Sequence, residues 1–145
     1  MSLFTVEQAN RTLPLVRRIV EDVVREHRRW QEKILELELV ASNAASAAAT
    51  AVGAERVGAP PDERVAAIER DAMAIAREID VFERELEKLG IVLKDRRLGL
   101  IDFPGEVDGR RVWLCWRLGE PAVQFWHDLD AGYAGRQPLP AAALK

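Results

Sequence analysis

Residues 65–89 read VAAIERDAMAIAREIDVFERELEKL, and apolar side chains recur in this stretch at alternating intervals of three and four residues. This spacing keeps the apolar side chains on one side of a helix and is typical of a coiled-coil seam. Asp62 is a good N-terminal cap, and Gly90 is a typical residue just past a helix end. The stretch therefore predicts a helix over residues 62–89. The ladder consists of Val65, Ile68, Ala72, Ile75, Ile79, Phe82, Leu86 and Leu89.

A second ladder with the same spacing lies upstream. Alanines continue it in step, and Thr5 with Gln8 fits a capping box at its start. We therefore expect a first helix over residues 5–52, with a turn or linker over residues 53–61. His27 is its one polar member; such a break usually fixes the register or the number of partners, and a metal or haem ligand is the alternative. Two such helices predict an antiparallel coiled-coil hairpin. The ladder consists of Leu13, Val16, Val20, Val23, His27, Trp30, Ile34 and Leu37.

The pattern changes after Gly90, where short segments rich in β-branched and aromatic residues alternate with turn signals. The segments read IVLKD, LGLIDFP, RRVWLCWRL and AVQFWHD, and Pro104-Gly105 and Asp108-Gly109 bracket one of the turns. They predict a small three- to four-stranded antiparallel β-meander over residues 91–130 and an extended tail over residues 131–145. The predicted fold class is therefore α+β, with residues 1–145 forming a single domain.

A strand register can be proposed by folding the chain about these turns. It sets Asp102 beside Arg111 on one face of the sheet and pairs Trp113 with Trp126. The same register points Cys115 and His127 to opposite faces, and a slip of one residue would reverse every side chain of a strand. A polar and aromatic surface is expected from Asp102, Arg111, Arg117, Trp113 and Trp126.

The densest group of polar residues is Cys115, Glu120, His127, Asp128 and Asp130, with Asp102 nearby in the proposed register. The candidate metal site is made of Cys115, Glu120, His127 and Asp128. Thiolate, imidazole and carboxylate are the ligands of zinc and similar divalent ions. A site built around Glu120, His127 and Asp128 could hold a metal-bound water for hydrolysis. The chain has no CxxC or HExxH pair, however. The alternative is structural: Cys115 packs as a small apolar residue, and the two carboxylates pair with Arg117 and Arg111.

The composition narrows the classes of function. Lys and Arg total 21 and Asp and Glu total 24, a formal net charge of −3, which argues against a sequence-independent nucleic-acid binder. No stretch of 18 apolar residues without charge is present, so we expect no membrane span. We expect no secretory signal, and a single cysteine fits a cytoplasmic protein.

Several short motifs are similar to those of a known family. They are FTVEQAN at residues 4–10, KD at 94–95, GLIDFP at 99–104, LCWRLGE at 114–120, WH at 126–127 and GYAGR at 132–136. With these motifs the chain resembles an uncharacterised prokaryotic family catalogued as a domain of unknown function. The resemblance covers most of the chain apart from the alanine-rich stretch. It implies the domain organisation but no activity.

The apolar stripe on the helices is wider than a two-helix seam needs, because Ile19, Val24, Leu35 and Leu39 lie beside it. Such a stripe usually meets a partner, so we expect a homodimer formed through the helices. The alternative is that the predicted sheet covers the extra apolar surface. The leading prediction is therefore a non-enzymatic, cytoplasmic, self-associating interaction module. The alternative is a divalent-metal site, with zinc as the natural ion and hydrolysis as its chemistry, on the predicted sheet.

Overall fold

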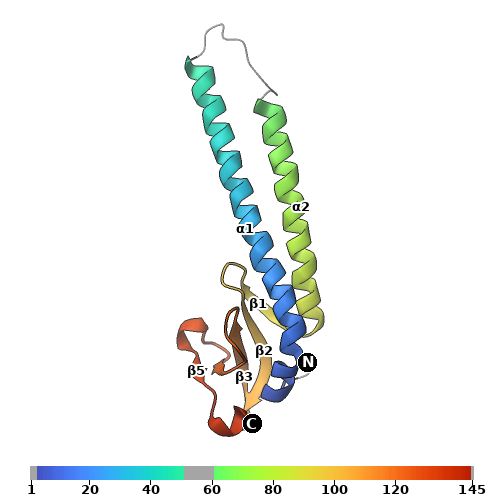
Figure 1. The fold of residues 1–145 in the computed structure, drawn as a ribbon. Coiled ribbons are helices and arrows are strands. Elements are labelled where there is room, and N and C mark those ends of the chain that lie inside the picture. Colours follow the sequence, from blue (N-terminus) through green and yellow to red (C-terminus); the bar gives the residue numbers. More distant parts are fainter. Residues whose placement is uncertain (1–2, 51–60, 145) are drawn as a thin grey trace. The chain divides into compact units, whose positions relative to one another are not determined.

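The computed structural model describes residues 3–50 and 61–144, and it confirms the α+β fold (Figure 1). Two long contacting helices form a hairpin and are followed by a five-stranded antiparallel sheet. The helices are α1 (Val6–Thr50) and α2 (Pro61–Lys88). The strands are β1 (Val92–Asp95), β2 (Leu100–Val107), β3 (Arg110–Arg117), β4 (Phe125–His127) and β5 (Gln137–Pro138), and short 3-10 helices cover Tyr133–Gly135 and Ala141–Leu144.

The chain divides into two compact units, a sheet unit and a helical unit. The sheet unit contains residues 1–25 and 80–145, and the helical unit contains residues 26–79. The expected end of the first helix at Val52 and most of the expected turn lie outside the described residues. Residues 137–138, within the predicted tail, form β5.

The helix ends in the sheet unit follow from local sequence signals. The Gln8 side chain accepts a hydrogen bond from the Thr5 backbone N–H (2.9 Å), and the Thr5 hydroxyl oxygen accepts one from the Gln8 N–H (3.0 Å), which confirms the capping box. After α2, the Gly90 N–H donates to Glu87 and the Ile91 N–H donates to Leu86. This paired arrangement needs a residue in the left-handed region, and Gly90 has φ +84°.

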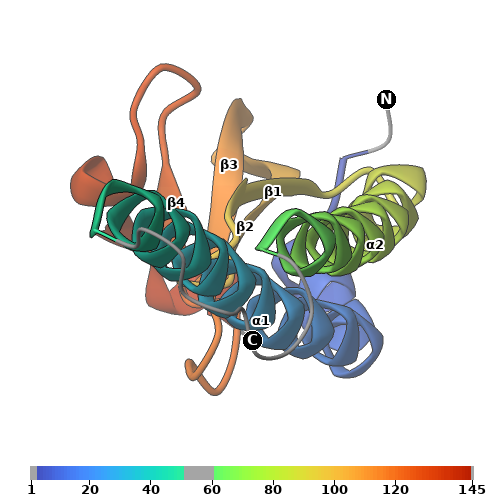
Figure 2. The ribbon, with the colours of Figure 1, turned by 90° about the horizontal axis from the view of Figure 1, so that it is seen from above.

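The strands follow one another across the sheet in chain order, each antiparallel to the next. Figure 2 shows β1 to β4 in this order. A two-residue turn at Asp108 and Gly109 joins β2 to β3, with φ of +53° and +76°. Two consecutive positive φ values are typical of a type I′ turn, which matches the twist of the strands it joins. The turn makes Val107 and Arg110 cross-strand partners and sets the rest of the pairing.

The predicted strand register is wrong. Asp102 pairs with Cys115 rather than Arg111, because β2 and β3 continue to the tight turn and include Pro104 and Gly105. These two residues look like turn residues but lie inside a strand. The pairing of β1 with β2 ends at Val92 and Asp102. Beyond that point, Phe4 forms an isolated β-bridge with Gly105 on β2.

The pairing of β4 is also shifted by one residue from the prediction. Trp113 pairs with His127, and Leu114 pairs with Trp126, so the two tryptophans face opposite sides of the sheet. The shift brings Cys115 and His127 to the same face of the sheet. His127 pairs with Trp113, and Trp113 and Cys115 are two residues apart on β3, so their side chains point to the same side. The expected ladder of Asp102 and Arg111 is absent from this face.

The core of the sheet unit lies between one face of the sheet and the two helices. Alternate residues of β2 and β3, such as Phe103 and Trp116, are fully buried with Val16 and Val20 of α1 and Leu86 of α2. Gly99 packs against α1 so closely that a Cβ there would lie 2.9 Å from a Val20 methyl group. The face opposite this core carries Asp102, Cys115 and His127.

The helical unit is a two-helix pair. Its buried apolar residues come from the α2 ladder: Ile68, Ala72, Ile75 and Ile79. His27 is half-buried, and its ring stacks on Trp30 with a centroid separation of 5.8 Å. Across the described residues, neither helix combines the length and apolar character needed to cross a membrane.

Candidate metal centre

Three potential metal ligands from three adjacent strands converge on the face opposite the core. Asp102 lies on β2, Cys115 on β3 and His127 on β4. One ligand atom from each lies within 4.8 Å of the other two. The residues are 2%, 0% and 2% exposed, respectively, so the group is closed to solvent. Within the described part of the chain, this is the one cluster of three such ligands.

The hydrogen bonds of His127 orient its ring. Nδ1 lies 2.9 Å from the backbone oxygen of Asp128, and Nε2 lies 3.0 Å from Oδ2 of Asp102. A carbonyl oxygen can only accept, so Nδ1 carries a proton and donates it. In the neutral ring, Nε2 then has a lone pair that points at a carboxylate oxygen. Two acceptors cannot satisfy each other, so a proton or a metal cation must lie between Nε2 and Oδ2.

The Asp102 carboxyl group is poorly compensated in its buried position. Its Oδ1 atom is inaccessible to solvent and receives no hydrogen bond from any described residue. Burial raises the pKa of Asp102 above its ordinary value of 3.8, while His127, Lys94 and the side-chain hydrogen bond with Cys115 act in the opposite direction. A buried carboxylate with one unpaired oxygen is costly unless a proton or a cation neutralises it.

Cys115 is a protonated thiol while it carries no metal. Burial raises its pKa from 9.0 to about 12, and the neighbouring Asp102 carboxylate adds to the effect. The Arg136 guanidinium, whose Nη1 lies 3.9 Å from the sulfur, lowers it in part. A bound cation would favour the thiolate by the same electrostatic argument, because a coordinating thiol is deprotonated.

Arg136 is held tightly beside this cysteine. Its two terminal nitrogens donate to the two oxygens of Glu120, at 2.9 and 2.7 Å. The guanidinium carbon also lies 4.0 Å from the ring centroid of Phe125 and 4.5 Å from that of Tyr133. The hydrogen bonds to Glu120 raise the pKa of Arg136 above its ordinary value. The bidentate hydrogen bonds and the two aromatic contacts therefore hold the Arg136 side chain in one position.

Two residues of the predicted metal site do not join the cluster. Glu120 is bound by Arg136, and its Oε1 also accepts the Arg117 backbone N–H at 2.7 Å. Asp128 forms a half-exposed ion pair with Arg110 at 3.1 Å. The structure thus brings Cys115 and His127 together with Asp102, and it gives both other carboxylates arginine partners different from the predicted ones.

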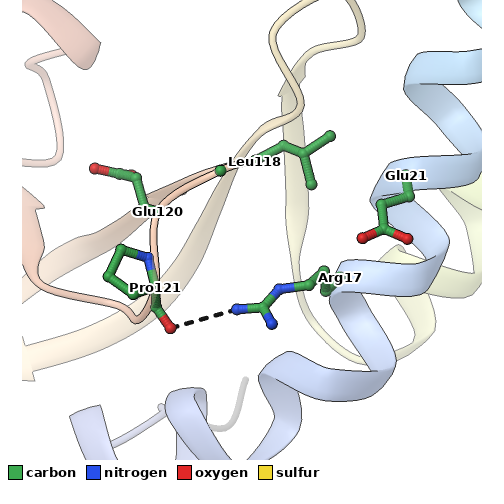
Figure 3. Close-up of a pocket in the computed structure, with 6 residues that line it drawn as sticks. Arg17, Glu21, Leu118, Glu120 and Pro121 are labelled. Carbon is green, nitrogen blue, oxygen red and sulfur yellow. Dashed lines mark hydrogen bonds between the residues drawn. The ribbon is translucent and has the colours of Figure 1, made fainter.

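Glu120 also lines a separate surface groove, which Figure 3 shows in close-up. The Arg17 guanidinium donates to the backbone oxygen of Pro121 at 3.3 Å, and the Glu120 carboxylate points away from it (Figure 3). The volume of this groove is about 350 Å³, and its lining carries no metal-ligand cluster among the described residues. Its lining is Arg17, Glu21, Leu118, Gly119, Glu120 and Pro121.

The predicted polar and aromatic surface is divided between separate contacts. The Arg110 guanidinium lies 5.2 Å from the ring centroid of Trp126. Arg117 donates to the Tyr133 hydroxyl at 3.2 Å. Trp113 and the exposed Arg111 line a smaller pocket of about 250 Å³. Asp102 belongs to the buried cluster instead.

The sequence prediction placed Asp102 near the candidate metal ligands but did not count it among them. The usable signal was the Asp108-Gly109 pair, a dipeptide strongly favoured in two-residue hairpins. Counting back from such a turn pairs Asp102 with Cys115 directly.

The comparisons with known proteins identify the family. No curated protein and no solved structure matches the chain. A family model described as an uncharacterized conserved protein matches residues 2–139, nearly the whole chain, in agreement with the resemblance of its motifs. The chain therefore belongs to the DUF2203 family of uncharacterized conserved proteins.

Proposed function

We propose that this protein is a metal-binding module in which Asp102, Cys115 and His127 hold one divalent cation, with zinc as the best match. The observation that carries the proposal is the buried contact between His127 Nε2 and Asp102 Oδ2, 3.0 Å apart, which needs a proton or a cation between the two atoms. A zinc ion bonds imidazole nitrogen and carboxylate oxygen at about 2.0–2.2 Å, so one ion can bridge two atoms at this separation.

The surroundings of His127 support the same assignment. Histidines that ligate metals usually donate the other ring N–H to a carboxylate or a backbone carbonyl, which fixes the tautomer. The Nδ1 contact with the Asp128 carbonyl oxygen fits that arrangement. The Oδ1 atom of Asp102, which has no hydrogen-bond partner among the described residues, offers a further ligand atom if the carboxylate binds the metal through both oxygens. With the Cys115 sulfur, the donors are then nitrogen, sulfur and oxygen, a mixture that suits zinc.

The burial of the cluster favours a structural ion over a hydrolytic one. A catalytic zinc keeps a position open to substrate, whereas structural sites are closed. All three proposed ligands are at most 2% exposed, so a substrate has no direct access. An ion that ties β2, β3 and β4 together would stabilise the sheet by binding only the folded chain. A zinc thiolate also fits a reducing compartment, so our proposal includes a cytoplasmic location.

Metal titration tests this proposal. Protein stripped with EDTA is titrated with zinc against a chromophoric chelator, and binding of one ion per chain is expected. Cobalt substitution is expected to add a sulfur-to-metal charge-transfer band, which Cys115→Ser removes. The variants Asp102→Asn and His127→Gln are expected to weaken zinc binding by on the order of 100-fold or more, since even partners of ligands contribute 10- to 100-fold.

Asp128→Asn is the matched control, because this carboxylate is next to His127 in sequence but is half-exposed and paired with Arg110. It is expected to keep the affinity of the wild type. The proposal fails if stripped protein takes up no stoichiometric zinc, or if the control and the ligand variants lose affinity equally. Circular dichroism of each metal-free variant establishes that the fold is retained.

Self-association is a second proposal, and it concerns the helical unit. Leu35, Leu39 and Met73 are 57%, 56% and 60% exposed, respectively, on a two-helix pair. Leu35 and Leu39 are four residues apart, so they lie on the same face of α1. We propose that a second copy of the chain covers this face. Sedimentation equilibrium should show a dimer that Leu35→Gln with Leu39→Gln dissociates, while Leu15→Gln in the sheet unit does not; a wild-type monomer at high concentration rules the dimer out.

A further inference from the structure

We infer that the Arg136–Glu120 ion pair is a clasp that seals the Cys115 side of the buried cluster and limits how fast metal enters and leaves. The inference rests on the proposed metal site for its function, but the seal itself can be tested without metal. Its basis is the position of one guanidinium, which touches the cysteine, a carboxylate and two aromatic rings.

The connection from β4 to β5 delivers this side chain to the cluster. Arg136 directly precedes β5, and Tyr133 begins the 3-10 helix just before it. Phe125 on β4 pairs with Cys115 on β3, and the Arg136 guanidinium carbon lies 4.0 Å from the Phe125 ring centroid. The guanidinium therefore lies over the strand residue beside the cysteine, and its Nη1 reaches 3.9 Å from the sulfur.

The clasp is held by contacts that have to break together. The fork to Glu120 is bidentate, and both side chains are largely buried, with exposures of 15% and 17%. Glu120 is itself anchored, because its Oε1 accepts the Arg117 N–H and its backbone oxygen accepts the Trp116 indole N–H at 3.0 Å. A bidentate, partly desolvated pair exchanges less readily than an exposed one.

A guanidinium beside a cation site has a further consequence. While the fork is formed, Glu120 neutralises its positive charge, and the two side chains together cover the Cys115 side of the cluster. Opening the clasp should therefore speed both association and dissociation of metal. The change in Kd should be smaller than the change in either rate, which distinguishes a gate from a ligand.

The chain offers a matched control pair on the same sheet. Arg110 and Asp128 also form an ion pair, at 3.1 Å, and Arg110 also lies over an aromatic ring, that of Trp126. The side chains of this pair are about half-exposed, and the structure gives neither of them a hydrogen bond or ion pair with Cys115. Arg110→Gln thus removes a similar interaction without opening the clasp.

The first experiment measures the reaction of Cys115 with an aromatic disulfide reagent in metal-free, folded protein. Arg136→Gln and Glu120→Gln are expected to accelerate labelling at least about tenfold, and Arg110→Gln to leave it unchanged. Urea unfolding of each variant supplies its loss of global stability. The inference is overturned if the clasp variants do not label faster, or if Arg110→Gln labels equally fast. It is also overturned if the acceleration is no larger than the increase in the unfolded population that the measured loss of stability predicts, because the reagent would then be reacting with unfolded chains.

The second experiment measures release of zinc to an excess of chelator. Both clasp variants are expected to release zinc at least about tenfold faster than the wild type, with a smaller change in Kd. Faster labelling in a protein that binds no zinc would refute the proposed metal function and leave the clasp intact. Zinc binding with unchanged labelling and release rates would refute the clasp alone.

Discussion

Asp102 and His127 belong to strands on either side of β3, yet their side chains meet over Cys115, with Oδ2 and Nε2 3.0 Å apart. The contact is closed to solvent. Since the other ring nitrogen donates to a backbone oxygen, the contact itself requires a proton or a cation.

Asp102→Asn is expected to leave the metal-free protein about as stable as the wild type. The Asn amide N–H can donate to Nε2 of His127, so the pair stays hydrogen-bonded and no buried charge remains. Asp102→Ala leaves Nε2 without a partner and is expected to lower the unfolding free energy by about 1–3 kcal/mol. Urea unfolding in EDTA measures both. Equal losses in the two variants would mean that an ion pair, rather than a shared proton, holds the contact.

The metal-free protein is expected to lose stability at alkaline pH through Cys115. Burial raises the pKa of its thiol from 9.0 to about 12. The folded chain then keeps a proton that the unfolded chain releases, so this contribution is complete below pH 9 and is lost as the pH rises toward 12. The loss is at most about 1.4 kcal/mol per pH unit.

The measurement is the difference between wild type and Cys115→Ala in urea unfolding with EDTA, from about pH 8 to about pH 10.5. The difference removes the contributions of all ionisable groups that the two proteins share. Wild type is expected to lose stability more steeply than the variant. Parallel curves would show that the thiol of the folded chain titrates as it does in the unfolded chain.

Gly99→Ala is expected to destabilise the sheet unit more than Gly119→Ala. Both glycines have positive φ, +67° and +104°, so both substitutions add backbone strain of about 1–2 kcal/mol. Only at Gly99 would the new Cβ also collide, at 2.8 Å from the Cβ of Leu118 and 2.9 Å from a Val20 methyl group. Overpacking adds about 1–3 kcal/mol. Thermal or urea unfolding of the two variants compares them directly, and equal losses would show that both Leu118 and α1 move aside without cost.

Some of these features could be read from the sequence because their causes are local. The alternating ladders predict the two helices, and Thr5 with Gln8 and Gly90 predict two of the helix ends, since backbone hydrogen bonds within a few residues decide them. The five short strands depend more on their partners, and the two-residue β5 has no pattern of its own.

The sequence by itself therefore determined the helices, the α+β class and the presence of cysteine, histidine and carboxylates in one region of the chain. Only the tertiary structure decided which of them meet. Register is usually read from the alternation of buried and exposed residues, but all but one residue of β2 are buried, Asp102 included. The pairing of β2 with β3 instead depends on the positive φ of Asp108 and Gly109, which gives a tight turn and places Asp102 beside Cys115. The separate pairing of β3 with β4 then brings His127 to the same buried point.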